Sequence, residues 1–151
     1  MPGVEHIKSH LGILGNLGFI YLHQGRLEEA EGLQTHVLKK AQSIFGPEDF
    51  CTLFSMAGLA RTYWQQKRWR EAEKLQLSTL EMSSRVLGVE HQSTIASVQD
   101  LAWTYHSQGR IIEAIVLLRK SLGGESSENT RYCEGFGQMA GRITPFVLSN
   151  G

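Results

Sequence analysis

The chain has 151 residues, of which 41% are hydrophobic and 20% are charged, a composition ordinary for a globular domain. Fifteen Lys and Arg residues balance fifteen Asp and Glu residues, so no basic excess favours nucleic acid or an anionic membrane as a partner. No apolar run approaches the roughly 20 residues of a membrane helix, no basic and apolar leader opens the chain, and the two cysteines show no disulfide framework, so we expect a cytoplasmic protein.

One stretch of sequence occurs three times, and the third copy has a shorter C-terminal part. Leu17 recurs as Leu59, 42 residues later, and again at the same spacing as Leu101. The other recurring residues are Tyr21, Gln24, Arg26, Glu29 and Ala30, then Tyr63, Gln66, Arg68, Glu71 and Ala72, then Tyr105, Gln108, Arg110, Glu113 and Ala114. A fixed period of this length is typical of stacked supersecondary units that form a solenoid. We expect a repeat domain over residues 1–122 with units 11–52, 53–94 and 95–122.

The first unit predicts two helices. Apolar residues from Leu11 to Tyr21 are spaced by three and four, which places them on one helical face. Gly25 should end this helix, because glycine adopts the left-handed conformation that closes a helix. A second apolar face runs from Leu27 to Phe45, and Gly46-Pro47 should end that helix.

The second and third units repeat this plan with two departures. Lys67 replaces the helix-closing glycine of the second unit, at a cost of about 1 kcal/mol. In the third unit Leu122-Gly123 matches Leu87-Gly88 but arrives seven residues early, so the last helix should be about two turns shorter.

Small residues recur on both sides of each turn, where the two helices of a unit should cross. They are Gly18, Ala60 and Ala102 before the turn and Ala30, Ala72 and Ala114 after it. Helix axes approach to roughly 8–10 Å only where the crossing side chains are small. A large residue at any of these positions should separate the hairpin.

Both ends of the chain depart from the repeat. Gly3-Val4-Glu5-His6 repeats the connector Gly88-Val89-Glu90-His91, so we expect the chain to open on the end of a preceding unit. We expect a degenerate cap helix over residues 123–142, because its glycines weaken a helix by about 1 kcal/mol each relative to alanine. Residues 143–151 should form a flexible tail.

The motif Asn16-Leu17-Gly18-x-x-Tyr21, followed by Gln24-Gly25-Arg26 and Glu29-Ala30-Glu31, resembles the tetratricopeptide repeat. The period and the connector resemble the long repeats of kinesin light chains and the arrays that follow a nucleotide-binding signalling ATPase domain in large fungal proteins. The resemblance covers about residues 3–122. It implies an all-α, right-handed superhelix of about three helical hairpins, the third shortened.

In such a solenoid the first helices of the units line the concave face. The resemblance places on it Gly12, Gly15, Asn16, Phe19, Leu22 and His23, then Phe54, Ala57, Gly58, Arg61, Trp64 and Gln65, then Ala96, Gln99, Asp100, Trp103, His106 and Ser107. The expected partner-binding residues among them are Asn16, Phe19, His23, Arg61, Trp64, Gln65, Gln99, Asp100, Trp103 and His106. These positions vary between units, as on a graded binding surface or on an unconstrained one. Large aromatic residues often anchor interfaces, but here they could equally pack against the neighbouring first helix.

The leading functional hypothesis is a non-catalytic module that binds a peptide or a partner helix in the concave groove. The alternative is a self-associating piece, joined end to end, or a sensor fragment of a longer array that belongs to a fungal nucleotide-binding signalling ATPase. Glu29, Glu71 and Glu113 recur with the period and so belong to the fold rather than to a catalytic centre. His6 and His10 have the spacing of a helical metal pair but no third ligand nearby, and no phosphate-binding loop is present. We therefore expect no enzyme activity, no metal and no cofactor.

Overall fold

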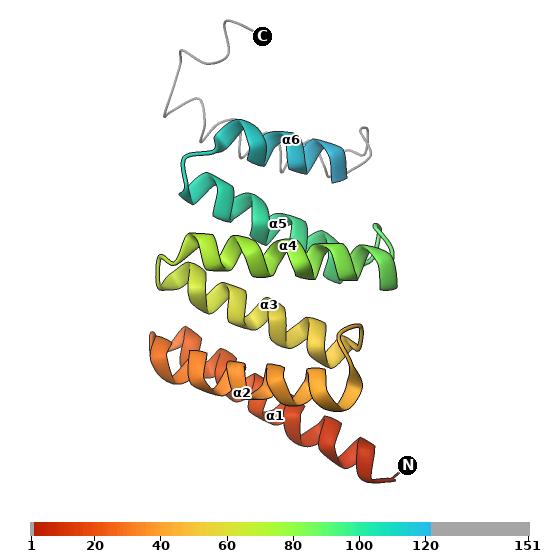
Figure 1. The fold of residues 1–151 in the computed structure, drawn as a ribbon. Helices are drawn as coiled ribbons and strands as arrows, with labels where there is room; N and C mark the ends of the chain where they lie inside the picture. Colours follow the sequence, from red (N-terminus) through yellow and green to blue (C-terminus); the bar gives the residue numbers. More distant parts are fainter. Residues whose placement is uncertain (1, 122–151) are drawn as a thin grey trace, which may run out of the picture.

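The computed structural model describes residues 2–121, which form six α-helices and no strand. They are α1 (Pro2–His23), α2 (Leu27–Phe45), α3 (Phe50–Gln65), α4 (Trp69–Val86), α5 (Gln92–Ser107) and α6 (Ile111–Ser121). Consecutive helices pack together, so three hairpins stack in chain order, with α1 at one end (Figure 1). α6 is described up to Ser121, the last described residue. The expected all-α solenoid is confirmed, and the shortening of the third hairpin stays a prediction. The expected cap helix and tail lie outside the described residues.

Each hairpin turns on one residue in the left-handed backbone region. Gly25 and Gly109 have φ of 75° and 79°, and Lys67 occupies the same place with φ of 60°. The arginine that follows each of them donates its backbone N–H to the carbonyl of the tyrosine five residues earlier. The distance from Arg68 N to Tyr63 O, for example, is 2.9 Å. This bond satisfies a carbonyl that the end of the helix leaves free. The turn therefore requires this backbone conformation, which lysine adopts less readily than glycine.

The connectors between hairpins are held by side-chain caps. Gly46 turns with φ of 86°, and Thr52 Oγ1 donates to its carbonyl at 2.7 Å. Asp49 then caps α3 by accepting a hydrogen bond from the backbone N–H of Cys51 at 2.9 Å. The expectation that residues 3–6 form a further connector is wrong, because α1 begins at Pro2 and runs through them. Gly46 and Gly88 open the connectors with φ of 86° and 93°, whereas Gly3 has the backbone conformation of the helix, so residues 3–6 belong to α1.

Small side chains at the helix crossings allow the hairpins to close. Ala30, Ala72 and Ala114 are fully buried, and Ala60 and Ala102 are at most 1% exposed. Larger apolar residues then pack around these crossings. For example, Val98 and Leu118 form one core cluster with Ala102 and Ala114 in the third hairpin. The crossings therefore sit where the small residues recur in the sequence.

A buried hydrogen bond joins each hairpin to the next. Thr62 Oγ1 on α3 donates to Gln34 Oε1 on α2 at 2.5 Å, and Thr104 Oγ1 on α5 donates to Gln76 Oε1 on α4 at 2.6 Å. All four side chains are at most 4% exposed. Since a buried polar group is costly without a partner, these pairs fix how one hairpin sits on the next.

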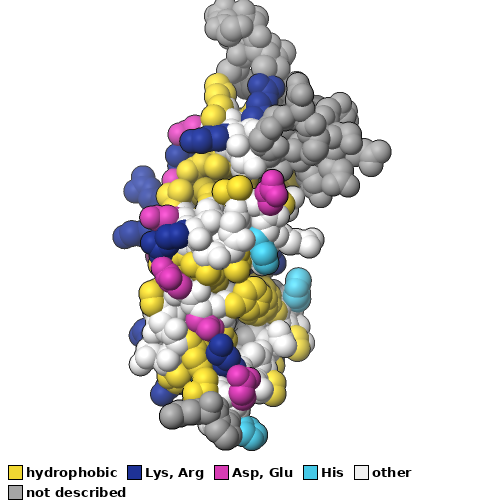
Figure 2. All heavy atoms as spheres, turned by 90° about the vertical axis from the view of Figure 1, so that its right-hand side faces the viewer, with side chains coloured by type: hydrophobic (Ala, Val, Ile, Leu, Met, Phe, Trp, Pro, Cys, Tyr) yellow, Lys and Arg dark blue, Asp and Glu magenta, His cyan; other side chains and the backbone are white. Residues whose placement is uncertain are grey.

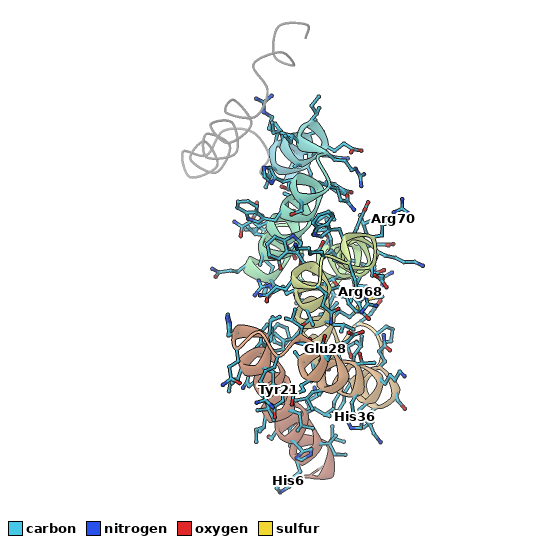
Figure 3. All side chains as sticks on the ribbon, turned by 90° about the vertical axis from the view of Figure 1, so that its left-hand side faces the viewer. His6, Tyr21, Glu28, His36, Arg68 and Arg70 are labelled. Carbon is cyan, nitrogen blue, oxygen red and sulfur yellow. The ribbon has the colours of Figure 1, made fainter. Side chains whose placement is uncertain are left out.

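A charged clamp accompanies each of these contacts. The guanidinium of Arg68 lies 4.4 Å from the centre of the Tyr63 ring, pairs with Glu71 and reaches Glu31 on the preceding hairpin at 2.9 Å. The hydrogen bond from Arg68 lowers the pKa of Glu71. Figure 3 shows Arg68 on the side of the stack where the hairpin turns lie. The recurring Glu, Arg and Tyr residues are thus part of the architecture.

Candidate binding groove

The inner helix α3 contacts both α1 and α5, and the three helices border an open pocket of about 340 Å³. Its lining consists of Phe19, Leu22, His23, Arg61, Trp64, Gln65, Gln76, Asp100 and Trp103. Seven of the ten expected binding residues are among them. The structure therefore brings most of the expected set to one place, whereas Asn16, Gln99 and His106 lie outside the lining.

A second pocket, of about 180 Å³, lies beside the first. It shares Phe19, Arg61 and Asp100 with the first pocket and adds, among others, Phe50 and Phe54. The side of the stack that carries the connectors shows hydrophobic side chains interleaved with charged ones along its length (Figure 2). The two pockets together form the candidate groove.

An ion pair stands where the two pockets meet. Arg61 Nε on α3 donates to Asp100 Oδ2 on α5 at 3.0 Å, and both residues line both pockets. The Arg61 side chain is 48% exposed, so the pair adds little stability in water. Its main effect on the groove is to pair the one Lys or Arg with the one Asp or Glu that the described residues contribute to the lining.

Trp64 and Trp103 are only partly covered. Trp64 is 37% exposed and donates its indole N–H to Ser107 Oγ at 3.1 Å, which ties α3 to α5. Trp103 is 40% exposed and meets the His106 ring edge-on at 5.7 Å. Each tryptophan thus packs on one side and borders the pocket on the other, which combines the two alternatives drawn from the sequence.

An aromatic row continues from the first pocket into the second. Phe19 and Phe54 have ring centres 5.2 Å apart, and Phe54 stacks on Phe50 at 6.3 Å. Phe50 is 57% exposed and was not among the expected positions. It lies one helical turn before Phe54, so extending the register by four residues would have found it.

Three positions expected to be exposed are buried: Gly15, Leu22 and Gly58. Leu22 is 3% exposed and contributes to the wall of the first pocket. Gly58 has no room for a side chain, since a Cβ there would lie 3.2 Å from the Phe19 ring and 3.3 Å from Gln34 Nε2. The direct contact between α1 and α3 takes up this part of the concave face.

The sequence analysis also missed Gln76, because it considered only the inner helices. Gln76 comes from α4 and is 4% exposed, yet it lines the first pocket. Its Oε1 already accepts from Thr104, so the group it can offer to a ligand is the amide donor. The signal available in the sequence was that Gln76 repeats Gln34 at the period of 42 residues.

The described residues include no cluster of three His, Cys, Asp or Glu side chains that could hold a metal ion. None of the described helices has the length and apolar character that would let it cross a membrane. Burial raises the pKa of the Cys51 thiol, which favours the protonated form.

The tetratricopeptide repeat family model matches residues 10–83 and 62–124. The chain belongs to the tetratricopeptide repeat family. Its repeats are of the kinesin-light-chain-like type, as solved structures with the same fold show. Nearly identical TPR-like repeats of a kinesin light chain from Podosopora anserina match with a TM-score of 0.75 and 25% identity, over 90% of this chain and 69% of theirs.

Two further structures share the fold. BtubC (BKLC) from P. vanneervenii matches with a TM-score of 0.75 and 20% identity, over 87% of this chain and 56% of its own. A variant of the Podosopora anserina repeats matches with a TM-score of 0.72 and 24% identity, over 90% of this chain and 72% of its own. A search of curated proteins found no match. The resemblance seen in the sequence is confirmed for the family and the repeat type.

Proposed function

We propose that the chain is a non-catalytic interaction module that binds a peptide or a partner helix in the groove of α1, α3 and α5. Tetratricopeptide repeats generally mediate protein–protein interaction and are typically non-catalytic. One observation supports the groove in particular. Two neighbouring pockets with largely apolar and aromatic walls lie on the inner helices and share the Arg61–Asp100 pair.

The charges of the groove favour an uncharged occupant. Among the described residues Arg61 is the only lysine or arginine of the groove. It already binds Asp100, so a terminal carboxylate would have to displace that partner. Apolar side chains can enter beside Trp64 and Phe54, while Gln76 offers an amide donor to a backbone carbonyl. We therefore propose an apolar segment of a protein, rather than an acidic or carboxylate-terminated peptide, a nucleic acid or a membrane. We propose the cytoplasm as its compartment.

The spacing of the pockets suggests the length of that segment. Trp64 and Phe54 are ten residues apart on α3, a rise of about 15 Å. An extended peptide covers about 15 Å in four to five residues. Two apolar side chains at that separation could occupy both pockets.

A selection from a random peptide library tests this proposal. Peptides selected on the wild-type protein are then measured against Trp64→Ala, Trp103→Ala and Leu77→Ala. Leu77 is 44% exposed on α4 and lines neither pocket, so it serves as the control. We expect about tenfold or greater loss of affinity in the tryptophan variants, as for interface anchors, with helicity and Tm almost unchanged. Equal binding by all four proteins would refute the groove, and a large fall of Tm would show that the tryptophans serve packing.

The second candidate function is association at the end of the stack, either with a second copy or within a longer array such as those of fungal nucleotide-binding signalling ATPases. The observation that favours it is the exposure of Ile13 and Ile20 on α1, at 67% and 51%. Light-scattering mass over a wide range of concentration tests self-association. A constant mass near 16.9 kDa would exclude it, and a rising mass would support it.

A further inference from the structure

A further pocket, of about 670 Å³, lies between the turn of the second hairpin and the turn of the third. We call it the turn pocket. It shares no described residue with either pocket of the groove. Its lining includes four basic and two acidic residues, which are Lys67, Arg68, Arg70 and Arg110, with Glu71 and Glu73. The turn pocket is therefore polar and more basic than acidic, unlike the groove.

Two of the four cations already bind the two carboxylates of the turn pocket. Arg68 pairs with Glu71 at 2.7 Å, and Arg110 pairs with Glu73 at 2.8 Å. Lys67 and Arg70 are exposed, and neither makes an ion pair with any residue that the structure describes. Figure 3 shows Arg70 reaching farther from the helices than Arg68. These two cations can therefore pair with an incoming anion.

The positions that match the turn pocket one repeat earlier have the opposite balance of charge. Their charged residues are Arg26 and Arg68 with Glu28, Glu29 and Glu31, so acidic residues outnumber basic ones. Two exchanges cause the difference. One places Lys67 where the first turn has Gly25, and the other places Arg70 where the first hairpin has Glu28. Because the first hairpin closes without these cations, the fold itself does not require them.

Lys67 holds its place against the preference of the backbone. Its φ is 60°, in the region where the other two turns have Gly25 and Gly109. A side chain kept in an unfavourable backbone conformation is a reason to look for a function of that side chain. Within residues 2–121 no carboxylate pairs with Lys67, so what it adds to the turn pocket is a free positive charge.

Trp69 adds an apolar wall between the two cations of the sequence. It is half-buried, lines the turn pocket and stands where the first hairpin has Leu27. Tryptophan is among the residues that most often anchor protein interfaces. A ligand of the turn pocket can therefore combine ion pairs with an apolar contact.

We propose that the turn pocket binds an acidic segment of a partner protein. Its carboxylates pair with Lys67 and Arg70, and an apolar side chain of the segment contacts Trp69. Separate carboxylates can each reach a cation and avoid Glu71 and Glu73, whereas the regularly spaced phosphates of a nucleic acid would meet these glutamates as well. The site is separate from the groove and does not depend on the function proposed for it.

The first hairpin supplies the variant for a test. Lys67→Gly with Arg70→Glu gives the second turn the residues of the first, which the fold accommodates. The control is Lys39→Gln with Lys40→Glu, which changes the net charge equally at exposed positions of α2 outside the turn pocket and the groove. The probes are a short peptide in which glutamate alternates with leucine and serine, its glutamine analogue, and a single-stranded oligothymidylate of equal length. Each is titrated against the ¹⁵N-labelled full chain.

We expect the glutamate peptide to shift the indole N–H signal of Trp69, and the glutamine peptide to bind at least about tenfold more weakly. The Lys67→Gly, Arg70→Glu variant should lose at least about fivefold in affinity for the glutamate peptide, because two cations are removed and one anion is added. The control variant should stay within about twofold of the wild type, and added salt should weaken binding, since the two cations are exposed.

Equal losses of affinity in the variant and its control would reveal a general effect of charge and overturn the proposal. A failure of the wild type to bind the glutamate peptide below about 1 mM would also overturn it. So would shifts of Trp64 and Trp103 with Trp69 in place, because the peptide would then lie in the groove. Tighter binding of the oligothymidylate, lost in the same variant, would make a nucleic acid the occupant and overturn the protein partner. The groove proposal survives each of these results, because its own test uses other variants and selected peptides.

Discussion

At the scale of single residues, Lys67 occupies a position where the backbone conformation, rather than the side chain, determines which residue stabilises the fold most. Its φ of 60° is the conformation that Gly25 and Gly109 adopt in the other two hairpins. The left-handed region brings a Cβ close to the following carbonyl, so a non-glycine residue there destabilises the folded state. The hairpin nevertheless closes, because the surrounding helices determine the turn.

Lys67→Gly should therefore stabilise the protein by about 1 kcal/mol, which raises Tm by a few degrees in a chain of this size. Chemical denaturation of the two proteins measures the difference in the free energy of unfolding. Lys67→Ala is the matched control, because it removes the ammonium group and keeps the Cβ. If Lys67→Ala gained as much stability as Lys67→Gly, the backbone explanation would be wrong.

A second residue-scale prediction concerns the buried pair between hairpins. Thr62→Val removes the hydroxyl that Gln34 Oε1 accepts from and should destabilise the protein by about 1–3 kcal/mol, since a buried acceptor loses its partner. The double variant Thr62→Val with Gln34→Leu should recover much of this loss, because both partners are then apolar. A double-mutant cycle by denaturant unfolding measures the coupling, and purely additive effects of the two changes would contradict it.

At the scale of the elements, an arginine before each outer helix binds a glutamate of that helix's first turn, and Arg68 and Arg110 also reach the preceding hairpin. Hydrogen bonds from Arg26, Arg68 and Arg110 lower the pKa of Glu29, Glu71 and Glu113 below the ordinary value of 4.5. A carboxylate whose pKa is lower in the folded state adds stability above the unfolded pKa and loses it as the pH falls through the folded pKa. These three pairs should thus contribute at neutral pH and fail in acid.

We expect Tm to fall as the pH is lowered below about 4.5, and we expect Glu71→Gln to make that fall shallower. Thermal unfolding followed by circular dichroism between neutral pH and acid measures both. All three carboxylates lie at the surface, so the effect should also shrink in high salt. Identical pH profiles of the variant and the wild type would show that the pairs contribute nothing.

The elements themselves were largely predictable, and the exceptions have physical reasons. The period of 42 residues, the glycines and the small crossing residues were enough to predict the hairpins, because each depends on local geometry. Residues 3–6 were assigned wrongly because the match in residue types did not reveal that Gly3 is helical, unlike Gly46 and Gly88, whose φ is positive. Leu22 and Gly58 were placed on an open surface because their burial results from the contact of α1 with α3, which the period does not encode.

At the scale of the whole molecule, the described stack presents two surfaces with different chemistry. The groove is shared by three inner helices and has its charges paired internally through Arg61 and Asp100. The outer face of α1 belongs to one helix and leaves Ile13 and Ile20 exposed. The sequence predicted seven of the groove residues from the family register. It could not predict the contribution of Gln76, because that residue reaches the groove from an outer helix.

The central claim, that the groove binds a partner segment, is tested most directly by the indole N–H signals of the three tryptophans in a ¹⁵N-labelled sample. A peptide selected on the wild-type protein is added stepwise, and the signals are followed by NMR. Trp64 and Trp103 line the groove, whereas Trp69 lies at the start of α4 and lines neither of its pockets. The account predicts that the Trp64 and Trp103 signals shift together and saturate while the Trp69 signal stays in place. A saturating shift of Trp69 alone, or binding that moves none of the three signals, would contradict it.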